Sequence, residues 1–403
     1  MSLLHRKVKR SKAVLVALAA VVTVGLLAPT SSVGADPKFA DSLVGSGSDT
    51  TMDVMAGLSG FANGKAFTPV QSSVGSGSKH ISSWDSKLAS HSDNCIAPKL
   101  KAPTVYRPNG SSEGRRALSR AIDGTVYGPV DQCGGSKVVT GLFDYARSSS
   151  GPSSGDTGTA LTYIPFGRDA LAVAYYANGV ANPVTDFTRA QITTLFTTGP
   201  QVIDGVEVIP CGIQTGSGTY QSWLGMTTAT ADQDASSTAT CSAAGTTTGR
   251  IQENDGAALK MKGDALVGKQ VIIGFSAGNF IAQGNGVALS QLASGVDLGT
   301  ISNDGTGADL GVAYTTAVVD TRTVYSPAPA FYASTVFGRN VYNVFDTARV
   351  TGFGNNDVKS LFVGPTSAVC SVEGQVTVNQ FGFSTIATCG SITLTGSLIT
   401  GIK

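Results

Sequence analysis

Three short runs of glycine and hydroxyl residues each precede a stretch in which apolar residues have helical spacing. They are residues 45–51 (GSGSDTT), 75–78 (GSGS) and 215–219 (TGSGT). The N-terminus of a helix carries backbone N–H groups without intrahelical partners and a partial positive charge, and glycine lets an anion approach the main chain. The sequence therefore predicts that these three loops surround one small anion.

The candidate ligands in these loops are hydroxyl groups and backbone amides. They belong to Ser48, Asp49, Thr50, Ser76, Ser78, Ser217, Gly218 and Thr219. The alternative is purely structural, because serine and aspartate are also ordinary N-cap residues and glycine also serves tight turns. The three similar runs in one chain favour the anion.

A bound anion is also expected to be neutralised by one arginine, because an arginine can make two parallel charge-assisted hydrogen bonds to an oxyanion. The competing interpretation of such an arginine is an ordinary salt bridge.

Two motifs resemble those of enzymes, but each lacks another residue that the chemistry requires. The segment 274–278 (GFSAG) matches the nucleophile elbow of serine hydrolases, but that fold needs a histidine after the serine, and the chain has only His5, His80 and His91. Ser276 is then expected to be the N-cap of a helix over 277–283. The segment 263–269 resembles a phosphate-binding loop, but Gln270 replaces the Ser or Thr that holds magnesium. We therefore expect no enzymatic activity.

The first 35 residues have the pattern of a secretion signal. Five Lys and Arg residues precede an apolar run over 13–27, and small residues lead to Ala35. The apolar run is shorter than the roughly 20 residues that span a bilayer, and no cysteine follows it to carry a lipid. The pattern predicts cleavage near Ala35 and a protein that is secreted, periplasmic or on the cell surface.

The charge of the remaining chain excludes several partners. Removal of residues 1–35 leaves 23 Lys and Arg against 27 Asp and Glu, so no basic surface for nucleic acid or anionic membranes is expected. The length suffices for two domains. We expect a monomer.

The six cysteines indicate disulfides, because an exported chain with an even number of cysteines usually pairs them. Fifteen pairings are possible. The spacing favours neighbours: Cys95 with Cys133, Cys211 with Cys241, and Cys370 with Cys389. A zinc site is the alternative, but the chain has no CxxC motif and no nearby pair of histidines, so we expect no metal.

Strands and helices alternate along the chain, which is typical of an α/β protein with parallel crossovers. Helices are expected after residue 51 with Ser48 or Asp49 as the N-cap, from about 107–113, after a cap at Thr185 or Asp186, over 253–262 and through Phe280. Strands are expected at 42–44, 141–145, 170–176, 270–275, 311–317 and 341–345.

The order of several segments resembles the phosphate-binding proteins of ABC importers. They are GSGSDTT (45–51), ARSS (146–149), YIPFGRDALAV (163–173), TGSGT (215–219) and IGF (273–275). The resemblance implies the α/β, two-lobed type II periplasmic-binding-protein fold, with a ligand cleft between the lobes. Lobe 1 would comprise 36–168 and 336–403, and lobe 2 would comprise 169–335.

The resemblance also assigns ligands by position. It places Ser48, Asp49 and Thr50 in the first loop, Ser76 or Ser78 in the second, and Ser217, Gly218 and Thr219 at the start of a helix in lobe 2. Two family positions differ: Ile213 stands where an arginine is usual and Thr215 where an acid is usual. Arg147 and Ser148 stand where the family has an aspartate that accepts the proton of hydrogen phosphate. The resemblance thus implies that Arg147 supplies the cation, with Ser148 beside it, unless Arg147 forms an ordinary salt bridge. Asp49 is the expected substitute for the aspartate.

The resemblance and the loops together imply an exported solute-binding protein that captures phosphate or a similar tetrahedral oxyanion for an ABC permease, without a cofactor. Two alternatives stay open from the residues alone. One is a secreted interaction or adhesion protein that uses the same scaffold without transport. The other is a secreted serine hydrolase built on Ser276.

Overall fold

The computed structural model describes residues 36–37, 43–72, 79–87, 94–242 and 249–402. The predicted signal segment 1–35 and the candidate ligands Ser76 and Ser78 lie outside these residues. The helices of the described residues are α1 (Met52–Leu58), α2 (Ser111–Asp123), α3 (Arg189–Thr198), α4 (Gly218–Thr227), α5 (Ala231–Ser237), α6 (Gly256–Asp264), α7 (Ala277–Gly284), α8 (Pro329–Ala333), α9 (Thr347–Thr351), α10 (Asn356–Phe362) and α11 (Val372–Gln380).

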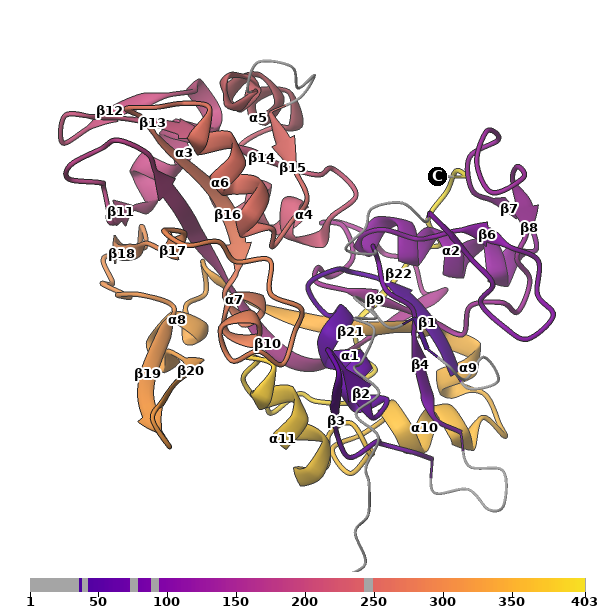
Figure 1. Cartoon of the computed structure of the whole chain (residues 1–403). Coiled ribbons are helices and arrows are strands. Elements are labelled where there is room, and N and C mark those ends of the chain that lie inside the picture. The colour runs from indigo at the N-terminus through magenta and orange to yellow at the C-terminus, as the bar shows by residue number, and fades with distance from the viewer. Residues whose placement is uncertain (1–35, 38–42, 73–78, 88–93, 243–248, 403) are drawn as a thin grey trace, which may run out of the picture. The chain divides into compact units, whose positions relative to one another are not determined.

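A single large sheet connects most of the chain (Figure 1). Its order within the described residues is β12 (Gln201–Ile203), β13 (Val206–Pro210), β16 (Gln270–Ser276), β10 (Leu161–Ala177), β21 (Gly338–Asp346), β9 (Tyr145–Ser148), β1 (Leu43–Gly47) and β4 (Ile81–Ser83). The short strands β17 (Asp297–Leu298) and β22 (Thr395–Gly396) also pair with β10. The mixed sheet with its helices confirms the predicted α/β class.

Smaller strand pairs complete the described structure. They are β2 (Phe61–Ala62) with β3 (Lys65–Ala66), β5 (Cys95–Ile96) with β6 (Val105–Tyr106), β7 (Val126–Tyr127) with β8 (Lys137–Val138), β11 (Asp186–Thr188) with β18 (Thr300–Asn303), β14 (Gly212–Ile213) with β15 (Arg250–Ile251), and β19 (Tyr314–Val319) with β20 (Arg322–Pro327).

Strand β10 serves two parts of the sheet in succession. Its first ten residues pair antiparallel with β21, and its last seven pair antiparallel with β16. The hydrophobic core is divided in a similar way. One large cluster draws on residues 170–337, and a second draws on residues 43–166 and 341–389 together with Ala282 and Ala288.

Most predicted elements are present, with shifted ends. Strand β16 covers the expected 270–275 and one residue more, and all its residues are buried around the apolar run 271–275. The expected strand at 141–145 begins only at Tyr145, since Gly141 adopts a positive φ in the preceding turn. The helix expected to start at Thr185 or Asp186 is instead capped by Thr188, whose side chain accepts from Gln191 N while the Gln191 side chain accepts from Thr188 N.

Two expectations about the glycine loops are wrong. The stretch that follows the second loop forms strand β4, not a helix, because it pairs with β1 in a parallel ladder. Ser48 and Asp49 do not cap α1, whose N-cap is Thr51 without a side-chain cap bond. At β4, tertiary pairing with the sheet overrides the short helical spacing.

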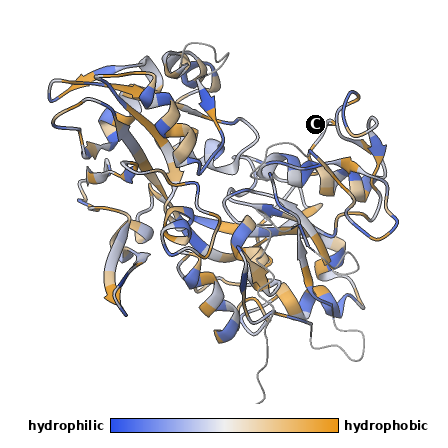
Figure 2. Cartoon of the chain, in the orientation of Figure 1, coloured by the Kyte–Doolittle hydropathy of each residue, from blue (hydrophilic) through white to orange (hydrophobic). Residues whose placement is uncertain are grey.

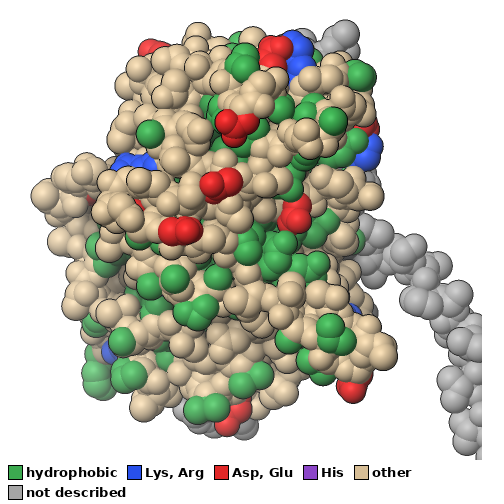
Figure 3. Space-filling view, turned by 90° about the vertical axis from the view of Figure 1, so that its left-hand side faces the viewer, with side chains coloured by type: hydrophobic (Ala, Val, Ile, Leu, Met, Phe, Trp, Pro, Cys, Tyr) green, Lys and Arg blue, Asp and Glu red, His purple; other side chains and the backbone are tan. Residues whose placement is uncertain are grey.

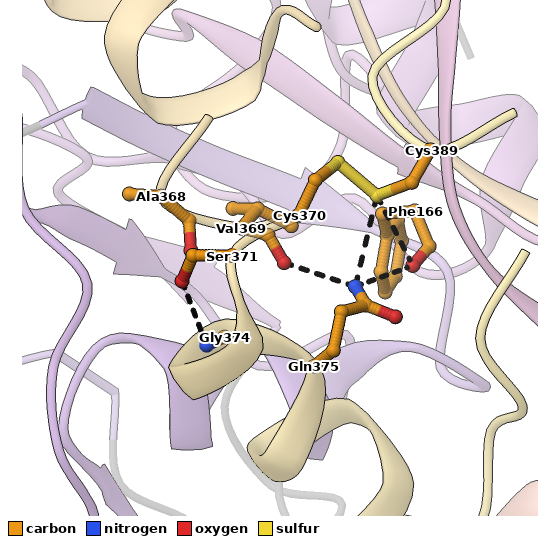
Figure 4. Close-up of a disulfide and its surroundings, with 8 residues drawn as sticks. All are labelled: Phe166, Ala368, Val369, Cys370, Ser371, Gly374, Gln375 and Cys389. Carbon is orange, nitrogen blue, oxygen red and sulfur yellow. Dashed lines mark hydrogen bonds between the residues drawn. A yellow bond between two sulfur atoms is a disulfide. The ribbon is translucent and has the colours of Figure 1, made fainter. Parts of the chain in front are cut away.

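Three disulfides confirm the predicted neighbour pairing: Cys95–Cys133, Cys211–Cys241 and Cys370–Cys389. Disulfides of this kind are typical of proteins that fold in an oxidising compartment. Figure 4 shows that the third lies against β10. There the Gln375 side chain donates to the carbonyl oxygens of Phe166 and Val369 at 3.1 and 2.9 Å. The register of β10 against β21 shifts at this point, so the C-terminal segment supports an irregularity in the central strand.

The described surface is sparsely charged. On the face drawn in Figure 3, basic side chains stand apart from one another and form no patch. The hairpin β19–β20 exposes Val318 and Val319 close to its turn, where Figure 2 shows hydrophobic colours. Among the described helices, none combines the length and hydrophobicity needed to cross a bilayer.

Two acids near β4 and α1, the buried Asp85 and the partly buried Asp53, should make the stability of the protein depend on pH. Burial, and next the negative charge of Asp36, raises the pKa of Asp85 to about 7. Burial, and next the negative charges of Asp85 and Asp49, raises the pKa of Asp53 to about 8. The folded state therefore keeps protons that the unfolded chain releases above about pH 4, and stability falls as pH rises from there to about 8.

We expect the melting temperature to decrease between pH 5 and pH 9 at constant ionic strength, measured by differential scanning fluorimetry. Asp85→Asn should flatten this decrease, because the amide does not titrate. A melting temperature that stays constant or rises over this range would contradict the assignment.

Candidate functional site

Two of the three glycine loops meet in the structure. The hydroxyl oxygens of Thr50, after β1, and Thr219, in the first turn of α4, lie 3.0 Å apart although 169 residues separate them. Both side chains are buried. A second contact joins the first loop to the segment before α6, because the Gln252 side chain donates to Asp49 Oδ2 at 2.8 Å. Residues from distant parts of the sequence thus form one polar cluster.

The start of α4 has the geometry of a helix N-terminus that can bind an anion. Ser217 Oγ accepts from Tyr220 N at 3.1 Å, so Ser217 is the N-cap that the structural alternative predicted. This role occupies only the amide of Tyr220, and the amides of Gly218 and Thr219 before it have no intrahelical partners. The N–H groups of Gly218 and Thr219 therefore lie beside the Thr50 hydroxyl with the positive end of the helix dipole behind them.

A further helix start lies at the same place, and the sequence interpretation did not assign it to the site. Ser111 is the first residue of α2, and its Oγ accepts from Ser149 N at 3.0 Å. A Cβ atom on Gly218 would lie only 2.4 Å from Ser111 Oγ and 2.5 Å from Ser149 Oγ. Only glycine allows α4 to approach these two hydroxyls so closely. The repeated glycine and serine pattern at 110–112 was the signal that could have identified Ser111.

The two remaining candidates of the first loop differ in their partners. Ser48 Oγ is buried and has no hydrogen-bond partner within the described residues. Asp49 Oδ2, besides its bond from Gln252, lies 3.4 Å from Lys87 Nζ. Asp49 is therefore already paired with a cation, whereas the Ser48 hydroxyl is available to a ligand.

Arg147 lies beneath the first loop, and its donors are used within the chain. The guanidinium is fully buried and donates to Ser83 Oγ at 2.8 Å and to the carbonyl oxygens of Trp84 at 2.7 Å, Ser48 at 3.1 Å and Gly47 at 3.4 Å. Its neighbour Ser148 donates to the carbonyl oxygen of Ser150 at 2.7 Å. These bonds hold the loop that carries Ser48 and Thr50 in place.

A buried carboxyl group, Glu253, was not predicted at the site. Its Oε2 accepts from Thr50 Oγ1 at 3.1 Å, while its Oε1 is buried without a hydrogen-bond partner among the described residues. The Gln214 side chain accepts from Glu253 N, and Gln214 Nε2 is also buried without a described partner. Burial, and next the charge of Asp49, raises the pKa of Glu253. The sequence interpretation placed this residue inside a helix that in fact begins at Gly256.

A positive charge lies beside Thr219, on the guanidinium of Arg339. The sequence interpretation did not assign Arg339 to the site. Arg339 Nη2 donates to Thr219 Oγ1 at 2.8 Å, and Nε and Nη2 donate to Asp169 Oδ2 at 3.0 and 2.7 Å. The cluster therefore combines hydroxyl and amide donors with the guanidinium of Arg339 and the carboxyl group of Glu253, whose pKa is raised.

The serine of the GFSAG segment has the structural role expected for it. Ser276 Oγ accepts from Asn279 N at 3.1 Å and caps α7 in an ordinary extended conformation, with φ −75° and ψ 120°. It donates to Asp169 at 2.9 Å. These features are those of an N-cap and differ from the strained turn of a nucleophile elbow.

No protein-family model matches the chain, and no curated protein is similar to it in sequence. Among solved structures, it is similar to a candidate substrate-binding protein of a phosphate ABC transporter with bound phosphate from Clostridium perfringens. The identity is 14%, the match covers 86% of this chain and 100% of the other, and the TM-score is 0.45.

Two further structures of the same kind are similar over most of the chain. For a phosphate-binding protein from Stenotrophomonas maltophilia the identity is 12%, the match covers 86% of this chain and 91% of the other, and the TM-score is 0.41. For an ABC-type phosphate transport receptor from Vibrio cholerae the identity is 13%, the match covers 69% of this chain and 86% of the other, and the TM-score is 0.38.

Proposed function

We propose that this protein captures phosphate, or a closely similar tetrahedral oxyanion, outside the cytoplasm and delivers it to an ABC permease. The observation that carries the proposal is the contact between Thr50 and Thr219 at the N-terminus of α4, near buried donors that have no partner among the described residues. Such donors are costly to bury unless something accepts their hydrogen bonds. A small oxyanion accepts several bonds at once.

Binding is non-covalent in this proposal. The amides of Gly218 and Thr219 and the hydroxyls of Ser48, Thr50 and Ser217 replace the water shell of the anion. Asp49, Ser76, Ser78, Arg147 and Ser148 remain assigned to the site as predicted, with Arg147 acting through the loop that it holds. The direct contacts between Thr50 and Thr219 would be exchanged for contacts to the ligand.

The two lobes remain part of the proposal, with residues 36–168 and 336–403 in one and 169–335 in the other. The division of the core supports them, because the two large hydrophobic clusters draw on almost the same residue ranges. Closure of one lobe on the other would bury the anion and produce the form that a permease recognises.

Native mass spectrometry of the protein as purified tests the proposal, because a trapped oxyanion adds its mass to the folded protein. Isothermal titration with phosphate and with sulfate then measures affinity. The absence both of a bound oxyanion and of a heat signal with either anion would overturn the proposed function.

Ser217→Ala is expected to weaken phosphate binding at least tenfold, about 1.4 kcal/mol, because it removes a hydroxyl and loosens the first turn of α4. Ser371→Ala is the matched control. Ser371 also caps a helix, with the same 3.1 Å bond to a backbone amide, but on α11. Equal affinities of both variants and the wild type in isothermal titration would remove Ser217 from the site.

A further inference from the structure

A buried ion pair joins the two long strands at the centre of the sheet. Asp169 in β10 and Arg339 in β21 are direct cross-strand partners, and their side chains are 0% and 8% exposed. Asp169 is fixed on its other side as well, since its Oδ1 accepts from Ser276 Oγ at 2.9 Å and from Gly278 N at 3.0 Å at the start of α7. The guanidinium is therefore held in one orientation.

This guanidinium reaches the loop cluster and is only partly used. Its Nη2 donates to Thr219 Oγ1 as well as to Asp169. Its Nη1 is buried and has no hydrogen-bond partner among the described residues. A guanidinium carries five N–H donors, and a planar pair of unused donors beside a hydroxyl suits an oxygen anion.

We infer that Arg339 is the cation that binds the anion, and that Asp169 is the positioning residue that orients it. The inference rests on the proposed function and names the source of the charge at that site. Arg147, the arginine expected from the sequence, has each of its three nitrogens bonded within its own half of the sheet. Arg339 is the arginine in direct contact with Thr219.

The position of Arg339 also defines the class of ligand. Asp169 already neutralises one unit of charge, and the buried Glu253 lies near, on the other side of Thr50 and Thr219. A site of this kind favours a small oxyanion that carries a proton, such as hydrogen phosphate, over an anion without a hydrogen-bond donor.

Titration of Arg339 variants with inorganic phosphate tests the inference. Arg339→Gln should weaken binding at least 100-fold because the charge is lost, and Arg339→Lys at least tenfold because the forked geometry is lost. The affinity of Arg339→Gln should also depend less on ionic strength than that of the wild type, which loss of a purely structural residue would not cause.

Arg168→Gln is the matched control. Arg168 precedes Asp169 in β10, and its donors go to the carbonyl oxygens of Tyr332 and Ser334 and to Asn340. Its replacement removes a comparable set of hydrogen bonds without a contact to Thr219. The control should bind phosphate as the wild type does.

If Arg339→Gln does not fold, as judged by circular dichroism, Thr219→Val and Arg339→Lys test the same contact with smaller changes. Wild-type affinity in the folded Arg339 variants overturns the inference and leaves the proposed function intact. A wild-type protein that binds neither phosphate nor sulfate overturns the proposed function itself.

Discussion

Arg147→Ala is expected to lower the free energy of unfolding by about 3–5 kcal/mol and to weaken phosphate binding at least tenfold. The guanidinium is fully buried, and its removal leaves the carbonyl oxygens of Ser48 and Trp84 and the Ser83 hydroxyl without their donor. It also removes positive charge from the neighbourhood of buried Asp85. Chemical denaturation at pH 7 measures the first effect, and isothermal titration measures the second.

The control for this prediction is Arg322→Ala on the exposed strand β20, which should change stability by less than about 0.5 kcal/mol. Unchanged stability of Arg147→Ala would contradict the role assigned to these hydrogen bonds. Unchanged phosphate affinity in a folded Arg147→Ala protein would instead show that the loop with Ser48 and Thr50 does not contact the anion.

Glu253→Gln is expected to reduce the preference for phosphate over sulfate at least tenfold at a pH at which Glu253 of the wild type is ionised. An ionised Glu253 can accept the proton of hydrogen phosphate, whereas it repels sulfate, which has no proton to share. Burial raises the pKa of Glu253, so the carboxyl group is neutral at low pH and loses its proton as pH rises. The wild type should therefore bind sulfate more weakly as pH increases, and the glutamine variant should lose this dependence.

Competition between the two anions in isothermal titration at pH 6 and pH 8 measures this selectivity. Glu207→Gln is the control, because Glu207 makes only a half-exposed ion pair with Lys269. The role of Glu253 is wrong if its glutamine variant discriminates between the anions as strongly as the control does.

Local features of this chain were predictable from its sequence. The disulfides join cysteines 19 to 38 residues apart, and strand β16 is a continuous buried run. The start of α4 follows from a serine N-cap and a glycine. Each of these depends on neighbours in sequence, where residue type and spacing suffice.

The missed parts of the site depend on distant partners. Arg339 and Thr219 are 120 residues apart, and Glu253 and Thr50 are 203 apart. Neither contact follows from spacing, because it exists only when β10 and β21 pair and the loops meet. The failure at β4 has the same origin, since the ladder with β1 decides its conformation. Asp49, expected to accept the proton of the ligand, is paired with Lys87, and Glu253 is a second buried carboxyl group at the site that sequence spacing did not reveal.

The position of β21 in the sheet determines when the sheet can be completed during synthesis of the chain. Although it is among the last strands to be synthesised, it lies between β10 and β9, so the two ends of the sheet stay separate until residue 346 has emerged. The N-terminal strands β1, β4 and β9 can join β10 only through β21, so folding includes a slow step that forms contacts between residues far apart in sequence. A nascent chain of this design cannot complete its central sheet until most of its residues have been synthesised.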